Sequence, residues 1–375
     1  MKRAEIVVIG GGPAGSATAA GLAAIDRDVL LIERAHGPHH KVCGEFLSID
    51  TQAQLQRLGI DPVDLGAVPI DRVALHARNR AVAVPLPFRA LSLSRYRLDR
   101  ALLRCAHSRG VRLKQGVAVR SVVWERGKWI VTCDDGDILH CWSLVLATGK
   151  VGLRGIEDVR DGSQVGLKMH LRLTPEIRDA LAGQVELFLM DRSYAGLELI
   201  EDGIGNLCFL LPRAVVAQLG AEWSALQNHL SLALPSLAER LSGAEPLFHK
   251  PVAVVCPTGG YLHSEAAPGV YRVGDRLAHI PPFTGDGLAI ALRSAALAVD
   301  HVRLGRSPEV YVAAARSLVG NMVRLASIVS GLAASQIGRA ALLGGAACAP
   351  SLIGAIARWT RVPLAIVESS GRSAG

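Results

Sequence analysis

Three glycines near the N-terminus, Gly10, Gly12 and Gly15, have the spacing of a loop that binds the diphosphate of a dinucleotide. The first permits a tight turn, the second lets the backbone approach phosphate without an intervening Cβ, and the third lets a helix pack closely on a strand. Pro13 and Ala14 lie inside the loop, and the next helix would point its N-terminal N–H groups at the diphosphate. The pattern predicts dinucleotide binding, and a glycine-rich turn without a ligand is the alternative.

An acidic residue follows at the place where a ribose would lie. Residues 5–9 are an apolar run, the glycines and a small-residue helix come next, and residues 28–33 are a second apolar run that ends at Glu33. Parallel pairing of two strands requires such a crossover. A carboxylate there can accept hydrogen bonds from adenosine ribose hydroxyls and would repel a 2′-phosphate. Strand, loop, helix and acid together are far more specific than the glycines alone.

A second set of signals comes late, in residues 270–292. A predicted strand ends at Gly274 and Asp275, a proline-rich loop follows, and a helix is expected to begin near Gly285–Gly287, with Asp286 between the two glycines. The Asp275 carboxylate can hold the ribitol chain of a flavin, and the helix N-terminus can stabilise negative charge on a reduced flavin ring. Motifs at both ends of the chain favour FAD over a nicotinamide dinucleotide. An ordinary turn and helix cap is the alternative.

A cysteine lies in the basic loop His39-His40-Lys41-Val42-Cys43-Gly44. Basic neighbours favour a thiolate, which makes Cys43 a candidate catalytic residue, and a small residue packed in a tight loop is the alternative. His279 lies in the loop expected to face the flavin and is the second candidate catalytic residue. His170 alternates with apolar residues, as either a site residue or a buried core histidine does.

Four segments resemble the FAD-dependent oxidoreductases that group geranylgeranyl reductases with aromatic hydroxylases and flavin halogenases. The segments are VVIGGGPAGSATA with Glu33–Arg34, KVCGEFLS at 41–48, SRYRLDRALLRCA at 94–106, and VGDRLAHIPPFTGDG at 273–287. They occur in the family's order over most of the chain, and the Cys43–Gly44 pair is similar to one beside the flavin in the reductase branch.

The resemblance implies which residues bind FAD. They are Gly10, Gly12, Pro13, Ala14, Gly15, Glu33 and Arg34 at the ADP half, Arg95 and Val119 beside the FAD, Gly274 and Asp275 at the ribitol–diphosphate, and Cys43, Gly44, Gly285, Asp286 and Gly287 at the flavin ring.

Three family motifs are changed or absent. The segment 194–199, YAGLEL, stands where prenyl-chain reductases have Y-x-W-x-F-P, which disfavours a prenyl-lipid substrate. Trp124 and Trp129 do not reproduce the W-x-W-x-I-P motif of halogenases. The Asp-Gly pair that hydroxylases carry after the strand ending at residues 147–150 is missing, so the way NAD(P)H engages stays open.

The resemblance implies an FAD-dependent oxidoreductase. The first two changes disfavour a prenyl-lipid reductase and a halogenase, and the expected function is a monooxygenase that hydroxylates or epoxidises a hydrophobic aromatic or polyketide-like small molecule. The alternatives are a carbon–carbon double-bond reductase of geranylgeranyl-reductase type that uses reduced FAD, and a flavin-binding module without turnover. No second Gly-x-Gly-x-x-Gly follows, so NAD(P)H that binds transiently or a partner reductase is expected to supply electrons. No metal site is expected.

The elements that must position these residues show two kinds of sequence pattern, which take turns along the chain. One consists of continuous apolar runs followed by helices, and the other of strands in which apolar and polar residues alternate. We therefore expect a doubly wound, Rossmann-like α/β FAD domain with an interleaved antiparallel substrate domain and C-terminal helices. The FAD domain is expected in residues 1–72, 95–160 and 265–306, the substrate domain in 73–94 and 161–264, and the helical region in 307–375. A hairpin turning at residues 78–79 and a meander over 112–142 are also expected.

Composition limits the partners. The 375 residues are 50% hydrophobic and carry a net charge of +8, but the arginines are dispersed, which disfavours nucleic-acid binding. Seven cysteines without a C-x-x-C pair indicate reduced thiols. No stretch is expected to span a membrane. A cytoplasmic protein is expected, whose C-terminal helices cap the substrate cleft or contact a membrane surface or a carrier-bound substrate.

Overall fold

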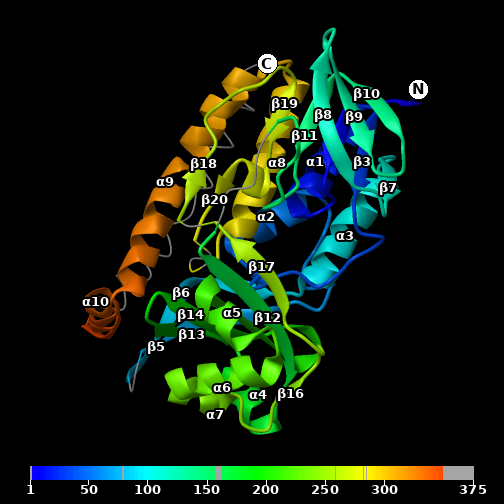
Figure 1. Cartoon of the computed structure of the whole chain (residues 1–375). Coiled ribbons are helices and arrows are strands. Elements are labelled where there is room, and N and C mark those ends of the chain that lie inside the picture. Colours follow the sequence, from blue (N-terminus) through cyan, green and yellow to red (C-terminus); the bar gives the residue numbers. More distant parts are fainter. Residues whose placement is uncertain are drawn as a thin grey trace.

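A five-stranded parallel sheet lies at the centre of the upper half of the molecule in Figure 1, a computed structural model that describes residues 2–77, 80–156, 162–257, 259–281, 283 and 285–348. The strand order is β19-β11-β2-β3-β7, and every pairing is parallel. The strands are β2 (Ile6–Ile9), β3 (Val29–Glu33), β7 (Arg112–Gln115), β11 (Ser143–Leu146) and β19 (Val270–Arg272). Apolar runs buried on both faces pair in this way.

One face of this sheet is covered by helices and the other by a second sheet. The helices are α1 (Pro13–Ala23), α3 (Arg95–Ser108) and α8 (Gly287–Arg303). The four-stranded cover consists of β1 (Lys2–Arg3), β10 (Ile138–Cys141), β9 (Lys128–Cys133) and β8 (Val119–Glu125). The meander expected over residues 112–142 is wrong at its start, because Gly116 turns the chain with φ +73° and leaves β7 in the parallel sheet.

A nine-stranded mixed sheet forms the lower half (Figure 1). Along its main path lie β16 (Glu245–Pro246), β12 (Gln164–Arg172), β15 (Ile204–Pro212), β14 (Ser193–Leu199), β13 (Gln184–Met190), β5 (Val68–Ala77), β6 (Arg80–Ser92) and β4 (Phe46–Leu47), and β17 (Val252–Cys256) pairs with β12. All of these pairings are antiparallel except β13 with β5. The strands β5 and β6 pair as the two arms of the expected hairpin, and its turn at residues 78–79 lies outside the described residues.

Short helices and turns complete this half. The helices α4 (Pro175–Leu181), α5 (Arg213–Leu219), α6 (Trp223–Ala233) and α7 (Pro235–Arg240) accompany the mixed sheet. α2 (Ile49–Arg57) follows β4, and the single turn η1 (Glu201–Gly203) joins β14 to β15. The single turn η2 (Gly274–Arg276) and the small pair β18 (Tyr261–Leu262) and β20 (Ala278–His279) follow the parallel sheet's last strands.

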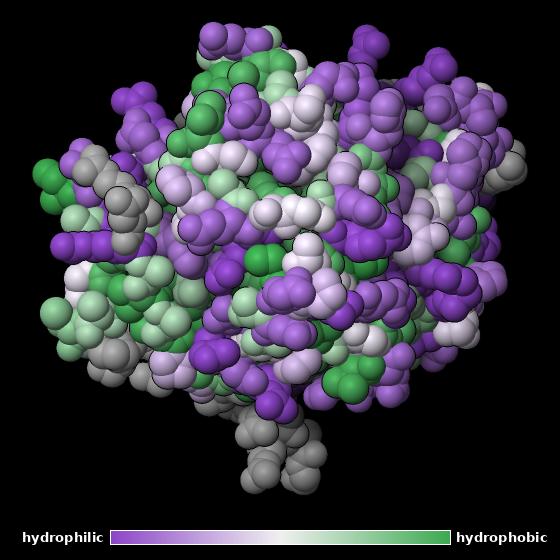
Figure 2. Space-filling view, turned by 90° about the horizontal axis from the view of Figure 1, so that it is seen from below, coloured by the Kyte–Doolittle hydropathy of each residue, from purple (hydrophilic) through white to green (hydrophobic). Residues whose placement is uncertain are grey.

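The C-terminal helices α9 (Pro308–Ala334) and α10 (Gln336–Cys348) run down one side of the molecule (Figure 1). α9 packs Tyr311, Val319 and Met322 into the core of the parallel-sheet half. Among the described residues, α9 is long and apolar enough to cross a membrane by length and composition, which corrects the expectation that no stretch qualifies. On the lower face, hydrophobic residues gather at the side where these helices lie, while most of that face is hydrophilic (Figure 2).

The observed architecture confirms the expected fold class: a Rossmann-like parallel sheet, a second sheet interleaved with it in sequence, and C-terminal helices. The strands of the mixed sheet come from two stretches between strands of the parallel one: β4–β6 lie between β3 and β7 in sequence, and β12–β17 lie between β11 and β19. Such interleaving brings chain segments distant in sequence to one boundary, which is where the candidate site lies.

Candidate active site

A cavity of ≈ 640 Å³ lies at the carboxyl ends of the parallel strands and extends toward the mixed sheet. This is the crevice in which open α/β sheets bind ligands. The structure brings most of the predicted site residues to its wall, from segments across nearly 280 positions of the chain. They are Gly10, Gly12, Pro13, Ala14, Glu33, Arg34, Cys43, Gly44, Arg95, Val119, Gly274, Asp275, His279, Gly285 and Gly287. Gly15 and Asp286 are not among the lining residues.

The glycine loop has the form that a diphosphate requires. A Cβ on Gly15 would overlap the carbonyl oxygen of Gly10, so Gly15 serves the packing of α1 on β2. A Cβ on Gly12 would point into open space, with the Arg95 guanidinium 4.0 Å away as its nearest neighbour. The Glu33 carboxylate accepts hydrogen bonds from the backbone N–H groups of Gly11 (2.5 Å) and Ala35 (2.9 Å). The cradle at Gly12 therefore fits the diphosphate of FAD.

Three ionisable groups gather at the other end of the cavity. Asp275 lies in η2, while Lys150 follows β11 and His279 lies in β20. Burial lowers the pKa of Lys150, but Asp275 together with Cys256 and Cys208 outweighs burial and leaves the lysine pKa raised. Burial lowers the pKa of His279 to about 4, so this imidazole is neutral at pH 7. Its Nε2 is buried and has no protein partner among the described residues, as expected of a group that faces a ligand.

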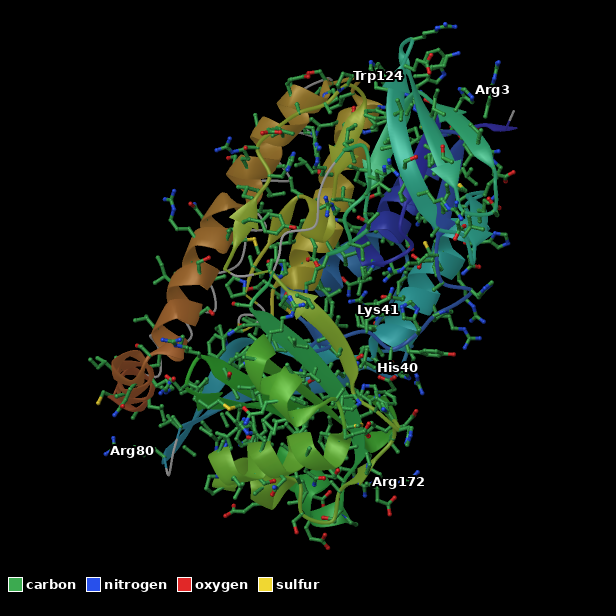
Figure 3. All side chains as sticks on the ribbon, in the orientation of Figure 1. Arg3, His40, Lys41, Arg80, Trp124 and Arg172 are labelled. Carbon is green, nitrogen blue, oxygen red and sulfur yellow. The ribbon has the colours of Figure 1, made fainter. Side chains whose placement is uncertain are left out.

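Arg95 belongs to an ion-pair cluster at the start of α3. Its guanidinium donates to Asp99 at 2.8 and 3.1 Å, and Lys41 donates to the same carboxylate at 2.9 Å. Burial raises the pKa of Asp99, but Arg95 and Lys41 outweigh it and leave that pKa below its usual value. Figure 3 places Lys41 and its neighbour His40 between α3 and the mixed sheet, so this cluster ties the basic loop to the parallel-sheet half.

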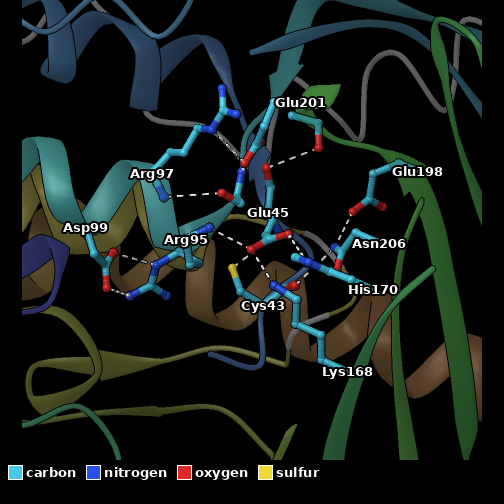
Figure 4. A network of polar contacts seen from close by, with 12 residues as sticks. Cys43, Glu45, Arg95, Arg97, Asp99, Lys168, His170, Glu198, Glu201 and Asn206 are labelled. Carbon is cyan, nitrogen blue, oxygen red and sulfur yellow. Dashed lines mark hydrogen bonds and ion pairs between the residues drawn. The ribbon is translucent and has the colours of Figure 1, made fainter. Parts of the chain in front are cut away.

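The carboxylate of Glu45 is the centre of a buried network (Figure 4). It accepts hydrogen bonds from the backbone N–H of Arg95 at 2.6 Å, from the ammonium of Lys168, and pairs with His170 Nε2 at 3.0 Å. Burial raises the pKa of Glu45, but His170 and Lys168 outweigh it and hold the pKa below its usual value. His170 is therefore a buried partner of Glu45, and it is not among the residues that line the cavity.

A second cavity of ≈ 210 Å³ adjoins the first. The two share the wall formed by Val42, Cys43, Gly44, Phe46, Lys150 and Gly285. The second cavity continues between the mixed sheet and the C-terminal helices, where Val329 and Leu342 line it. Because Gly285 and the Cys43 loop are the residues expected at the flavin ring, this chamber lies where a substrate would meet that ring.

Apolar side chains make up most of the chamber, with one acid among them. Tyr194, Gly196 and Glu198 occupy alternate positions of β14 and line it together, as residues on one face of a strand do. Glu198 is 2% exposed and accepts a hydrogen bond from Asn206 at 2.6 Å. Glu198 is not among the residues predicted from the sequence, although an acid at an inward position of an otherwise apolar strand is a detectable signal. The contacts of Glu45 are not predicted either.

The thiols near the site are free. Cys43 accepts a hydrogen bond from the backbone N–H of Glu45 at 3.3 Å, and Cys256 receives one from the Lys150 ammonium at 3.6 Å. Burial raises the pKa of Cys208, which lines the same chamber, to a value at which its thiol is neutral. In the described part of the chain, no group of three or more histidine, cysteine or acidic residues could hold a metal ion.

Comparisons with known proteins agree with this geometry. Residues 8–52 match the NAD(P)-binding Rossmann-like domain family. The menaquinone reductase of Mycolicibacterium smegmatis is 27% identical over 329 residues, covering 81% of this chain and 77% of that protein. The flavin-dependent brominase Bmp2 superposes with a TM-score of 0.80 at 18% identity over 96% of this chain and 93% of its own. Pseudomonas aeruginosa PqsL in complex with 2-aminobenzoylacetate gives a TM-score of 0.75 at 16% identity over 92% and 99%.

Fold and site together define a flavoprotein oxidoreductase, and its cofactor is FAD. The chain is similar over most of its length to members of the FAD-dependent oxidoreductase superfamily. The predicted resemblance and the predicted cofactor are thereby confirmed. The roles assigned to individual site residues remain predictions, supported by their common position around one cavity.

Replacing Gly12 by valine tests the diphosphate cradle. Since a Cβ there meets open space, Gly12→Val should fold normally but fill the cradle, weakening FAD binding at least about a hundredfold. Flavin absorbance after gel filtration and the thermal unfolding midpoint measure the two effects. Gly37→Val is the matched control, because a Cβ at Gly37 also meets nothing within 4 Å and Gly37 does not line the cavity. A Gly12→Val protein that retains full flavin would refute the assignment.

Replacing Glu45 by glutamine tests the buried network. The variant leaves the Lys168 ammonium buried without a carboxylate, so the free energy of unfolding in urea at pH 7 should fall by about 3–5 kcal/mol. Glu245→Gln breaks an exposed pair with Arg172 and should cost about 1 kcal/mol or less. Because the folded pKa of Glu45 is depressed, its stabilisation should vanish as the pH falls through that value. Equal losses in the two variants would contradict the central role of Glu45.

Proposed function

We propose that this oxidoreductase is a monooxygenase that hydroxylates or epoxidises a compact, hydrophobic aromatic or polyketide-like molecule. The observation that carries the proposal is the apolar chamber of ≈ 210 Å³ that shares a wall with the FAD cavity. A chamber of this size suits one ring system better than a long prenyl chain. Its apolar lining excludes water, which would otherwise divert oxygen transfer into side reactions.

The residues of the chain have distinct parts in this chemistry. Reduced FAD, when bound, supplies the electrons that let one oxygen atom of O₂ enter the substrate while the other leaves as water. The N-terminus of α8 at Gly287 offers backbone N–H groups to negative charge on the ring, and Lys150 adds a cation beside Asp275. The loop holding Cys43 and Gly44 separates the two cavities and orients the substrate against the ring.

A double-bond reductase is the second candidate. The menaquinone reductase of M. smegmatis, which is similar over most of both chains, favours it, as does the Cys43–Gly44 pair. PqsL, named as "a probable FAD-dependent monooxygenase", shares the fold and supports the first candidate at the level of architecture only. Both candidates use the same FAD cavity and the same chamber. They differ in whether oxygen enters the product.

The electron donor and the substrate source belong to the same proposal. NAD(P)H binding transiently, or a partner reductase, supplies the electrons. The exposed apolar residues Ile328, Leu332 and Ile337, on α9 and α10, favour contact with a membrane surface or a carrier that delivers a hydrophobic substrate to a cytoplasmic enzyme.

Isotope labelling separates the candidates. The purified holoenzyme is reduced by dithionite and mixed with a panel of naphthols, alkylphenols and aryl compounds that carry an alkenyl side chain, under ¹⁸O₂ or under argon. Monooxygenation predicts products that carry one ¹⁸O atom, require oxygen, and are detected by mass spectrometry. Products that form under argon and gain two hydrogen atoms would overturn the proposal in favour of the reductase. Retained FAD with neither product would leave only a flavin-binding module.

A further inference from the structure

The carboxyl group of Glu198 lies in the chamber without a counter-ion. In the part of the chain that the structure describes, its one hydrogen bond comes from Asn206 Nδ2, and no ion pair reaches it. The same amide nitrogen donates to the carbonyl oxygen of Cys43 at 3.3 Å (Figure 4). Asn206 thus fixes the acid of β14 relative to the loop expected at the flavin ring. Glu198 cannot move without disturbing that loop.

The surroundings of Glu198 keep its proton in place. The pKa of Glu198 is raised to about 8, chiefly by burial and further by the negative charge of Glu45. The hydrogen bond from Asn206 and the positive charge of Lys168 act in the opposite direction. The other ionisable groups lining the chamber are Lys150, Tyr194, Cys43, Cys208 and Cys256. At neutral pH the group is therefore a carboxylic acid, whose O–H can donate a hydrogen bond. An ionised acid could only accept one.

Lys150 and Tyr194 also line the chamber as nitrogen and oxygen donors, and both have raised pKa values. Lys150 is held by Cys256 and by the field of Asp275. Burial raises the pKa of Tyr194 well above its usual value, so its hydroxyl keeps the proton throughout the range in which Glu198 ionises. A dependence on pH between 6.5 and 9.5 consequently isolates Glu198 from Tyr194.

We propose that Glu198 recognises the substrate by donating a hydrogen bond to a carbonyl oxygen, which makes compact aryl ketones the chemical class that this chamber selects. A carbonyl oxygen would accept from the O–H of this neutral acid, which is 2% exposed and lies among apolar walls where an unpaired polar group is costly. An anionic ligand is disfavoured because it would lose its hydration in a chamber lined mostly by apolar side chains. The inference rests on the proposed function in one respect: the chamber is the substrate site.

A matched pair of probes tests the inference without turnover. 2-Acetylnaphthalene and 2-ethylnaphthalene have nearly the same shape and differ in one carbonyl oxygen. Isothermal titration calorimetry with the oxidised holoenzyme should show the ketone binding about tenfold more tightly at pH 6.5, the upper range for one hydrogen bond. The pH sign follows from the raised pKa: the donor is present below about 8 and is lost above it. At pH 9.5 the preference should therefore disappear.

Two variants complete the test. Glu198→Gln keeps an N–H donor that does not titrate, so the ketone preference should persist at both pH values. Glu198→Leu should abolish the preference at both while 2-ethylnaphthalene still binds. Glu245→Gln, at an exposed position, is the control and should behave as the unaltered protein. FAD content and the thermal midpoint show that each variant is folded.

Each outcome has one meaning. Equal affinity of both probes at both pH values in the unaltered protein would overturn the role of Glu198 while leaving the chamber as an apolar site. A ketone preference that survives in Glu198→Leu would overturn it as well and assign the donor to Tyr194 or Lys150. No binding of either probe would overturn the chamber as the substrate site, and with it the part of the proposed function on which the inference rests.

Discussion

The structure depends above all on one buried carboxylate, that of Glu45. It joins the loop before β4, the first turn of α3 and strand β12, whose partner residues lie 50, 123 and 125 positions from Glu45 in the sequence. Glu45 itself has φ +55°, a left-handed conformation that costs a non-glycine residue about 1 kcal/mol and persists only where its surroundings require it. Buried ion pairs add little net stability, because desolvation offsets their attraction. What this network supplies is position: it fixes the wall between the FAD cavity and the chamber.

A second carboxyl group, that of Glu198 on β14 of the mixed sheet, has the opposite protonation state. Glu45 faces an ammonium and an imidazole, and its pKa is lowered, whereas Glu198 faces a neutral amide, and its pKa is raised to about 8. Environments that shift the pKa values of two acids in opposite directions are typical of sites in which the two acids have different roles. Here the ionised acid holds the scaffold together, and the neutral acid remains available to a ligand. Asn206 and the Cys43 loop connect the two, so the position of one depends on that of the other.

The sequence predicted well what depends on local rules. Gly10, Gly12, Gly15 and Glu33 lie within one strand–helix–strand unit, and their geometry follows from that unit wherever it occurs. The contacts of Glu45 with Lys168 and of Glu198 with Asn206 follow from the register of β12, β14 and β15, which no local pattern determines. The prediction for β7 was wrong for a related reason. Its alternating sequence is typical of a meander strand, and only its pairing with β3 places it in the parallel sheet. The inward alternation of Tyr194, Gly196 and Glu198 was readable, but only the fold shows what those side chains face.

Apolar side chains of the C-terminal helices line the same chamber as Glu198 and contribute to its low polarity. Val329 of α9 and Leu342 of α10 close the far end of the chamber. If water entered there, it would solvate the carboxylate form and return the pKa of Glu198 toward the ordinary value for glutamate of about 4.3. The proton on Glu198 and the dryness that the proposed oxygen transfer requires therefore both depend on the packing of these helices at the chamber. This explains why apolar residues are needed on the inner face of α9, where composition alone suggests a membrane segment.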